Sequence, residues 1–235
     1  GDVYKRQVMT IKGVEIPMHD PRGKQGFGLS YAASPRGANH MEGMHDTMLE
    51  GDAPTPELGI TKGMNRFQLK GKAKVAVLYE NLRSFTNSLI LCAFTTNMTG
   101  SWYNYPHIRK LLKLATGLEL SPQDMLTIGE RNFALLRLYS GLVGYRREHD
   151  RLPERFYEPL PRGGSAGHCI DRDQFQQELN EYYRLRGWNT YGPTKEKLRE
   201  LGLSELAEMF PLKKEENGLD TGPNHDPSLT PKSGF

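Results

Sequence analysis

The chain has 235 residues, which is enough for one large domain or two small ones. Its 31 Lys and Arg residues against 28 Asp and Glu residues leave a net charge of only +3, and no basic stripe with interleaved aromatic residues is present, so the sequence does not indicate a nucleic-acid-binding protein. Hydrophobic residues make up 37% of the chain, which allows a real core, but no apolar run approaches the roughly 20 residues of a membrane span.

The first seven residues, GDVYKRQ, resemble the translation of a transposon-end sequencing adaptor. We interpret residues 1–7 as a non-native scar, and we expect the natural gene to have begun upstream, so that the chain is a fragment. The two cysteines, Cys92 and Cys169, are too few for a secreted disulfide scaffold. This cysteine usage favours a reducing, cytoplasmic compartment.

Residues 8–65 are rich in Gly, Pro, Met and His and have no sustained periodicity, so we expect mostly loop with short helices. A loop region of this length inside a compact domain usually serves a site. Gly26 and Gly28 could allow the backbone to approach a large ligand closely. An ordinary Gly-rich connection is the open alternative, because the pair lacks the strand and the third glycine of a dinucleotide-binding motif.

Apolar residues at three- and four-residue spacing predict helices over residues 67–92, 104–115 and 173–186. Another helix is predicted to begin after Ser121, with Pro122 in its first turn and Asp124 completing a capping box, and to end near residues 141–144. Thr194 caps a short helix over residues 195–201. Residues 152–167 read as loop, and the polar residues 213–235 as a disordered tail. The predicted fold is all-α, an irregular helical bundle over residues 8–212 with a long Gly/Pro-rich N-terminal loop region.

Two groups of residues could carry chemistry. Histidine is the usual proton-transfer residue near neutral pH, but the spacing of His19, His40 and His45 does not match a regular helical metal pair, and a structural or exposed role is the ordinary interpretation. Cys92 follows an apolar segment, where a free cysteine usually packs in the core. A single cysteine cannot hold an iron–sulfur cluster without three partners, and the sequence offers only Cys169.

Five segments in a fixed order carry a resemblance: HDPRGKQGFGLSYAASPRGANH from residue 19, NSLILCAFTT from residue 87, LTIGERNFALLR from residue 126, the Pro- and Gly-rich residues 152–167, and EYYRLRGWNTYGPTKEKLRELGL from residue 181. Together they resemble the tungsten-containing aldehyde ferredoxin oxidoreductases, over about residues 16–203. Each motif alone is modest, but their order and spacing are specific. The chain is therefore similar to the C-terminal portion of that family.

The resemblance implies a bis-pterin cofactor holding tungsten or molybdenum, a [4Fe-4S] cluster, and oxidation of an aldehyde to a carboxylate with electrons passing to ferredoxin. It places His40 where the family has a histidine beside the metal, as the proton-handling catalytic residue. It places Cys92 where the family has the fourth cluster ligand, and Asn87 where the family often has an aspartate that hydrogen-bonds the pterin. The resemblance also implies that Leu91, the residue before Cys92, binds the cofactor.

The chain departs from the family pattern at several points. Asn87 carries no charge, and Ile90 stands where many members have a glycine. The family's C-x-x-C-x-x-x-C group and its pterin-binding sheet domain are absent, so the missing N-terminal domains would be partners of this chain. We expect the chain alone to be inactive and to expose apolar surface. On a helix, Asn87 and Cys92 would be separated by a rise of about 7.5 Å, so one helix would contact both cofactors.

Two alternatives stay open. The first is a tungsten aryl-CoA reductase subunit, which would use similar motifs on another substrate. The second is a helical, non-enzymatic binding module whose aromatic residues near the C-terminus (Tyr182, Tyr183 and Trp188) form an interaction surface rather than core. A homodimer is compatible with either enzyme. If the enzyme interpretation is right, His40 should lie on the same side of the domain as Cys92.

Overall fold

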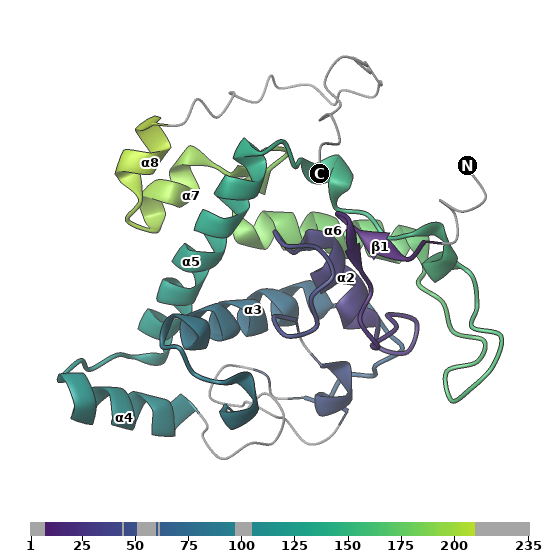
Figure 1. The fold of residues 1–235 in the computed structure, drawn as a ribbon, viewed down its shortest axis with the longest axis horizontal. Coiled ribbons are helices and arrows are strands. Elements are labelled where there is room, and N and C mark those ends of the chain that lie inside the picture. The colour runs from purple at the N-terminus through teal and green to yellow at the C-terminus, as the bar shows by residue number, and fades with distance from the viewer. Residues whose placement is uncertain (1–7, 44, 51–59, 61, 97–104, 210–235) are drawn as a thin grey trace, which may run out of the picture.

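The computed structural model describes residues 8–43, 45–50, 60, 62–96 and 105–209. The described parts of the chain are mostly helical and form an irregular helical bundle, which confirms the predicted all-α class (Figure 1). The proposed scar over residues 1–7 and the polar tail over residues 213–235 lie outside the described residues.

Helix α3 (Lys72–Ser88) lies at the centre of the bundle, and the longest helix, α5 (Pro122–Leu142), crosses it (Figure 1). The two backbones meet at Gly129 of α5, where an added Cβ would lie 1.8 Å from the backbone carbonyl oxygen of Asn81 in α3. Only glycine allows this approach. Helix α5 begins as predicted, because Ser121 and Asp124 form a reciprocal capping box and Pro122 occupies the first turn.

Helix α6 (Arg172–Arg186) packs alongside α3, and the short helix α2 (Gln25–Ala33) packs on both. Their apolar faces build the largest core cluster, whose members include Phe27, Leu29, Tyr31, Phe133, Phe156, Phe175, Leu179, Tyr182, Tyr183 and Trp188. Tyr182 and Tyr183 at the end of α6 and Trp188 just after it therefore belong to the core, which removes the aromatic interaction surface of the binding-module alternative.

All nine residues of α2 are buried, and this corrects the expected role of its glycines. Gly26 and Gly28 lie inside a helix rather than a ligand loop. A Cβ on Gly28 would meet the side chains of Ile170 and Leu152 at ordinary contact distances of 3.4 and 3.5 Å. The surroundings of Gly28 are therefore apolar side chains of the core and not an open ligand site, and a Cβ would fit there.

The peripheral helices are α4 (Tyr105–Thr116), α7 (Lys195–Glu200) and α8 (Ser204–Met209), with short 3-10 turns η1 (Asp46–Met48), η3 (Ala93–Thr95), η4 (Arg147–His149) and η5 (Glu154–Tyr157) between the larger elements. Helix α6 ends at Arg186 as predicted and starts at Arg172, one residue before the predicted start; Asp171 is its N-cap, and Gly187 lies in the left-handed region at its C-terminus. In the described parts of the chain, every helix is too short or too polar to cross a bilayer.

The structure also has two small antiparallel hairpins that the sequence did not predict. Strand β1 (Thr10–Ile11) pairs with β2 (Val14–Glu15), and β3 (Trp188–Asn189) pairs with β4 (Gly192–Pro193). Each strand has only two residues, which is too short for a period of two to be visible in a sequence.

The predicted helix over residues 67–92 is wrong at both ends. Helix α3 begins at Lys72, after Gly71 at φ +81°, and ends at Ser88. Ile90 then adopts φ +59°, in the left-handed region that stops a right-handed helix. Cys92 therefore lies beyond the helix. It has an extended backbone conformation and directly precedes η3. The expected helical rise from Asn87 to Cys92 does not exist, because the chain turns between them.

Candidate functional site

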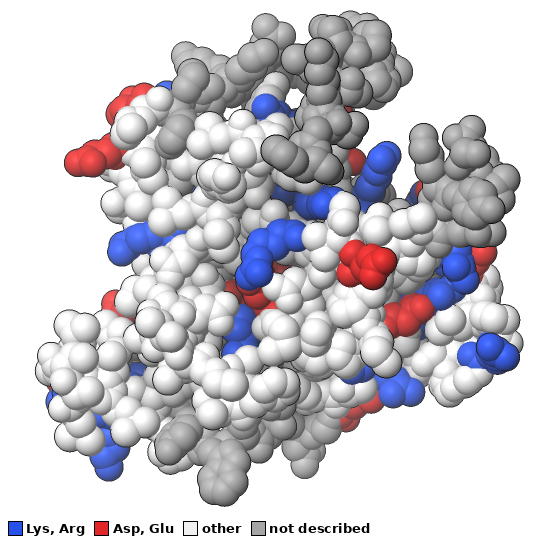
Figure 2. All heavy atoms as spheres, in the orientation of Figure 1, with Lys and Arg blue, Asp and Glu red and all other residues white. Residues whose placement is uncertain are grey.

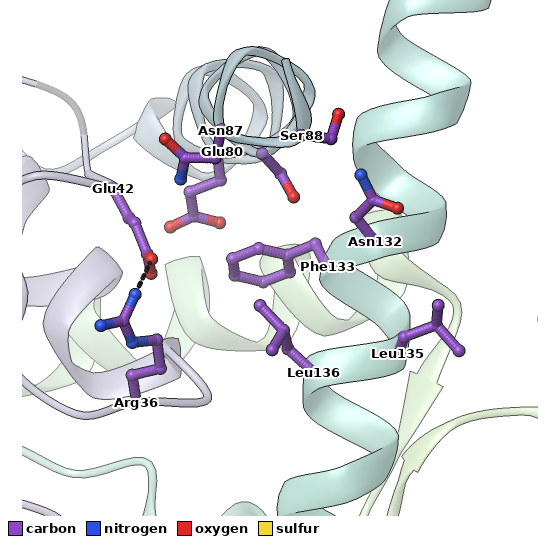
Figure 3. A pocket seen from close by; sticks show the side chains of 10 residues that line it. Arg36, Glu42, Glu80, Asn87, Ser88, Asn132, Phe133, Leu135 and Leu136 are labelled. Carbon is purple, nitrogen blue, oxygen red and sulfur yellow. Dashed lines mark hydrogen bonds and ion pairs between the residues drawn. The ribbon is translucent and has the colours of Figure 1, made fainter. Parts of the chain in front are cut away.

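Asn87 lies in the last turn of α3 and lines a cavity of about 500 Å³ between α3, α5 and the segment that follows α2. Figure 3 shows its side chain and that of Glu80 on α3, facing Phe133 of α5 and Leu136 below it. Residues 80, 84, 87 and 88 recur at helical spacing, so they occupy one face of α3. The amide of Asn87 could donate to or accept from a polar ligand edge in this cavity.

Glu42 and Arg36 close the opposite side of this cavity, where Arg36 donates to Glu42 Oε1 at 2.6 Å (Figure 3). The other carboxylate oxygen of Glu42 is buried and has no hydrogen-bond partner among the described residues. The cavity thus combines apolar walls from α5 with the buried carboxylate oxygen of Glu42 and the amide of Asn87. This composition is typical of sites that hold a polar organic ligand.

A second cavity of about 190 Å³ lies between α3, the segment that follows α2, the N-terminal region and η3. It is lined by His19, His40, Met41, His45, Arg83, Ala93 and Phe94. His40 therefore faces the same space as Ala93, which directly follows Cys92. The predicted placement of His40 on the Cys92 side of the domain is confirmed, whereas the catalytic role of His40 stays a prediction.

The three histidines form one cluster. The ring centroid of His19 lies 4.9 Å from that of His40 and 5.1 Å from that of His45. His19 also stacks on Phe27 of α2, with the two ring centroids 5.6 Å apart. Burial, together with the nearby Lys24 and the other two imidazoles, lowers the pKa of His45 to about 4. Burial and Lys24, whose Nζ lies 3.3 Å from His19 Nδ1, also lower the pKa of His19. His45 is therefore neutral at neutral pH.

Cys92 is a free, exposed thiol in the turn after α3. Its carbonyl oxygen accepts hydrogen bonds from the backbone N–H and the hydroxyl of Thr95, at 3.0 and 2.8 Å, which fix the turn. Leu91 beside it is 37% exposed and Ile90 is 92% exposed. The ordinary interpretation of Cys92 as a packed core cysteine is wrong, because the residue is exposed.

The described residues contain no group of three or more His, Cys, Asp or Glu side chains placed to hold a metal ion. Cys92 could contribute one thiolate to a four-iron cluster, but such a cluster needs four ligands, and the sequence has only two cysteines. The donor set of this chain therefore fits one corner of a cluster. The remaining ligands would have to come from elsewhere.

Sequence reasoning missed Arg83, Glu42 and Arg36 as cavity residues. Arg83 lies one helical turn before Asn87 on α3, and this spacing is the one signal that could have found it. Glu42 and Arg36 follow α2 in an irregular segment, and their neighbours are set by the crossing of α3 and α5, which no local pattern reveals.

Comparison with known proteins identifies a family. Residues 2–203 match the family model described as aldehyde ferredoxin oxidoreductase, domains 2 and 3. The chain is 37% identical over 203 residues to the tungsten-containing aldehyde ferredoxin oxidoreductase of Pyrococcus furiosus, and 35% identical to that of Thermococcus kodakarensis; each match covers 84% of this chain and 31% of the relative. The chain thus spans about a third of the length of these relatives.

More distant matches agree on the fold. An aliphatic sulfonate oxidoreductase subunit of the WOR-like type from Pyrococcus furiosus is 28% identical over 216 residues, covering 87% of this chain and 29% of the relative. A solved structure of the BamBC active-site complex of benzoyl coenzyme A reductase superimposes with a TM-score of 0.63 at 18% identity, covering 87% of this chain and 34% of that one. Together with the order of motifs in this sequence, the family match shows that the chain belongs to the aldehyde ferredoxin oxidoreductase family.

Proposed function

We propose that this chain forms part of an enzyme that oxidises an aldehyde to a carboxylate, with a tungsten- or molybdenum-pterin and a [4Fe-4S] cluster as cofactors and ferredoxin as electron acceptor. The observation that carries the proposal is the convergence of two cavities on α3: one lined by Asn87, the other by His40 and the residues after Cys92. Family membership supports the cofactors and the reaction type.

The overall reaction takes up water and releases two electrons and three protons as the aldehyde becomes a carboxylate. The pterin-held metal, when bound, supplies an acceptor for the two electrons. His40 would take a proton from the water that adds to the carbonyl carbon, since a histidine imidazole can accept and donate a proton at its ring nitrogens. The neutral His45 and His19 beside it hold this region of the cavity free of fixed cationic imidazolium charge.

Asn87 would hydrogen-bond the polar edge of the pterin from the first cavity. Cys92 would ligate the cluster through its exposed thiolate. Because the turn at Ile90 separates the two residues, the spacing between pterin and cluster contacts would be set by that turn and by its hydrogen bonds to Thr86 and Asn87, from the backbone N–H groups of Leu91 and Ile90. Leu91 would pack against the cofactor from the same turn.

The rest of the enzyme would pack on the exposed apolar side of α5 and α4. Six apolar residues there are at least 40% exposed: Leu136, Tyr139 and Leu142 on α5, Val143 directly after it, and Leu111 and Leu114 on α4. Figure 2 shows uncharged atoms covering most of the part of this face where α4 and α5 lie. Patches of this kind mark protein interfaces. The N-terminal domains of the enzyme would cover this surface, and a cytoplasmic location goes with a ferredoxin partner.

The test is paramagnetic resonance of the reduced, complete protein carrying Cys92→Ser. We expect the variant to keep its pterin while the cluster signal shifts or converts to that of a three-iron form, because one thiolate has been removed. Cys169→Ser is the matched control and should leave the spectrum unchanged. A spectrum and activity identical to the parent in Cys92→Ser would mean that the exposed thiol ligates nothing.

The related proposal for His40 is tested by steady-state kinetics. His40→Ala should retain both cofactors and lower kcat by roughly 10²–10⁴, the range expected for loss of an acid–base residue. Asn87→Asp should be tolerated, because an ionised acceptor makes a stronger hydrogen bond than an amide.

An aryl-CoA reductase remains the second candidate, supported only by the shared fold of the benzoyl coenzyme A reductase structure. Such an enzyme would reduce an aromatic thioester and fail to oxidise aldehydes.

A further inference from the structure

Arg83 is a buried cation in the wall of the histidine cavity. Its side chain is 3% exposed, and it lies on α3 one turn before Asn87. One guanidinium nitrogen donates to the hydroxyl of Thr96 at 3.1 Å. Its Nε is buried and has no hydrogen-bond acceptor among the described residues. The guanidinium therefore reaches the cavity with donor capacity to spare.

The other buried cations of the described chain each contact a carboxylate. These ion pairs are Lys12–Asp150 at 2.7 Å, Arg22–Asp20 at 2.8 Å, Lys72–Asp46, Arg137–Asp150 at 3.0 Å and Arg186–Glu80 at 2.7 Å. Arg83 differs from all of them, because no carboxylate of the described residues lies within 4 Å of it. The polar contact that Arg83 makes with Thr96 is with a neutral hydroxyl.

An unneutralised guanidinium in such a place is costly. Removing a charge from water costs several kcal/mol unless a counter-charge offsets it. Burial accordingly lowers the pKa of Arg83, while the more distant Tyr105, Glu42 and Cys92 raise it without forming an ion pair. Arginine nevertheless stays protonated in proteins. A buried positive charge with no counter-charge among the described residues is therefore set up to receive an anion.

The cavity suits a small planar anion. Its volume is about 190 Å³, and its walls are the three imidazoles, the thioether of Met41 and the apolar Ala93 and Phe94, with the guanidinium of Arg83. Phe94 is 70% exposed, so this wall reaches the surface. The planar fork of a guanidinium matches the two oxygens of a carboxylate, with which it forms paired charge-assisted hydrogen bonds.

We propose that Arg83 binds the carboxylate group of a small organic acid in this cavity, on the side of α3 next to His40. Identification of that acid as the reaction product rests on the proposed function, since oxidation of an aldehyde beside His40 would create a carboxylate there. An acid group already present on a substrate would be recognised in the same way. Arg83 would thus select for ligands that carry, or acquire, a negative charge.

Calorimetric titration and thermal unfolding of the purified protein, without aldehyde, test this assignment with acetate as the probe. Acetate should bind and raise Tm, because a ligand bound only to the folded state stabilises it. Arg83→Met should weaken acetate binding by tenfold or more and remove the rise in Tm. Its Tm without acetate should equal or exceed that of the parent, because an unpaired buried charge is replaced by apolar packing. Arg83→Lys should bind acetate with intermediate affinity.

Arg131→Gln is the matched control, because Arg131 lies on α5 away from this cavity and donates to the Leu201 carbonyl oxygen; it should leave acetate binding unchanged. Chloride at equal ionic strength should not reproduce the effect of acetate. Phosphate binding in place of acetate would assign Arg83 to a phosphate group, such as one on a cofactor, and would overturn the carboxylate proposal. So would acetate affinity that is equal in the parent and Arg83→Met, or a lower Tm of Arg83→Met without ligand.

The two proposals fail separately. Acetate binding that depends on Arg83, in a protein that oxidises no aldehyde, would keep the anion site and refute the proposed reaction. Aldehyde oxidation without Arg83-dependent acetate binding would support the proposed reaction and refute the anion site.

Discussion

Ile90 is the residue at which the turn between α3 and Cys92 is decided. It has φ +59°, a conformation that costs an L-residue about 1–2 kcal/mol and glycine almost nothing. Its side chain is 92% exposed, so little burial would be lost on truncation. The sequence resemblance expects a glycine at this position, and the backbone conformation supplies the physical reason.

Ile90→Gly should therefore stabilise the protein by about 0.5–1 kcal/mol, the relief of the left-handed strain less the added entropy of glycine in the unfolded chain. Urea unfolding of the variant and parent measures the difference. Leu91→Gly is the control, because Leu91 has no positive φ and the same substitution there should destabilise. An equal loss of stability in both variants would show that Ile90 is not strained.

The histidine cluster makes stability depend on pH. His45 has a folded-state pKa of about 4, below the ordinary histidine value of 6.5, so the unfolded chain binds the proton more tightly. The stability that this difference contributes is fully present above pH 6.5, and it is lost as the pH falls towards 4. His19, with its pKa also lowered, acts in the same direction.

His45→Gln should consequently flatten the decline in Tm between pH 6.5 and pH 4. His149→Gln should leave that decline as it is in the parent, because His149 lies in η4, outside the cluster. Thermal unfolding scans across this pH range provide the measurement. A parent-like slope in His45→Gln would mean that other groups account for the acid sensitivity.

At the scale of elements, the crossing of α3 and α5 depends on Gly129. The contact of its Cα with the Asn81 carbonyl group leaves no space for a methyl group, and neither backbone can shift without moving the helix that carries Glu80, Arg83 and Asn87. Both candidate cavities are walled by α3, so the crossing sets their shape.

Gly129→Ala should cost about 3 kcal/mol or more in the free energy of unfolding, although alanine is the better helix former, because overpacking outweighs helix propensity. Gly164→Ala, at a loop glycine with nothing within 4 Å of the added Cβ, should change stability by less than about 0.5 kcal/mol. Chemical denaturation separates the two. A neutral Gly129→Ala would require the helices to cross with more clearance than the structure has.

At the scale of the whole molecule, Asp150 ties distant parts of the chain together. Its carboxylate accepts from Lys12 at 2.7 Å, from Arg137 of α5 at 3.0 Å and from the hydroxyl of Tyr183 of α6 at 2.5 Å. The N-terminal hairpin loop and two helices thus meet at one fully buried anion. Removing the anion would leave two buried cations without their counter-charge.

Asp150→Asn should accordingly destabilise the protein by about 3–5 kcal/mol, the usual cost of breaking a buried ion pair from one side. Glu154→Gln, which removes the exposed pair with Arg172, should cost less than about 1 kcal/mol. Thermal unfolding of both variants at neutral pH gives the comparison. Similar effects for the two substitutions would argue against a buried network around Asp150.

The helix ends that the sequence predicted well are those set by capping residues next to them in the chain. Ser121, Pro122 and Asp124 start α5, and Gly187 ends α6, so these boundaries could be found from neighbouring residues alone. The end of α3 could not. It depends on the left-handed turn at Ile90, a residue type that by itself favours extended structure, and the surrounding packing holds the turn in place.

The sequence by itself determined the all-α class, most of the helices, the family resemblance and the candidates His40, Asn87, Leu91 and Cys92, because periodicity, caps and motifs are properties of neighbouring residues. Only the tertiary structure decided that His40 and the residues after Cys92 share a cavity, that Gly26 and Gly28 lie in a buried helix, and that Arg83 is buried with no carboxylate of the described residues beside it. Cavities and ion pairs join residues far apart in the chain, and their formation follows from helix packing rather than from any local pattern.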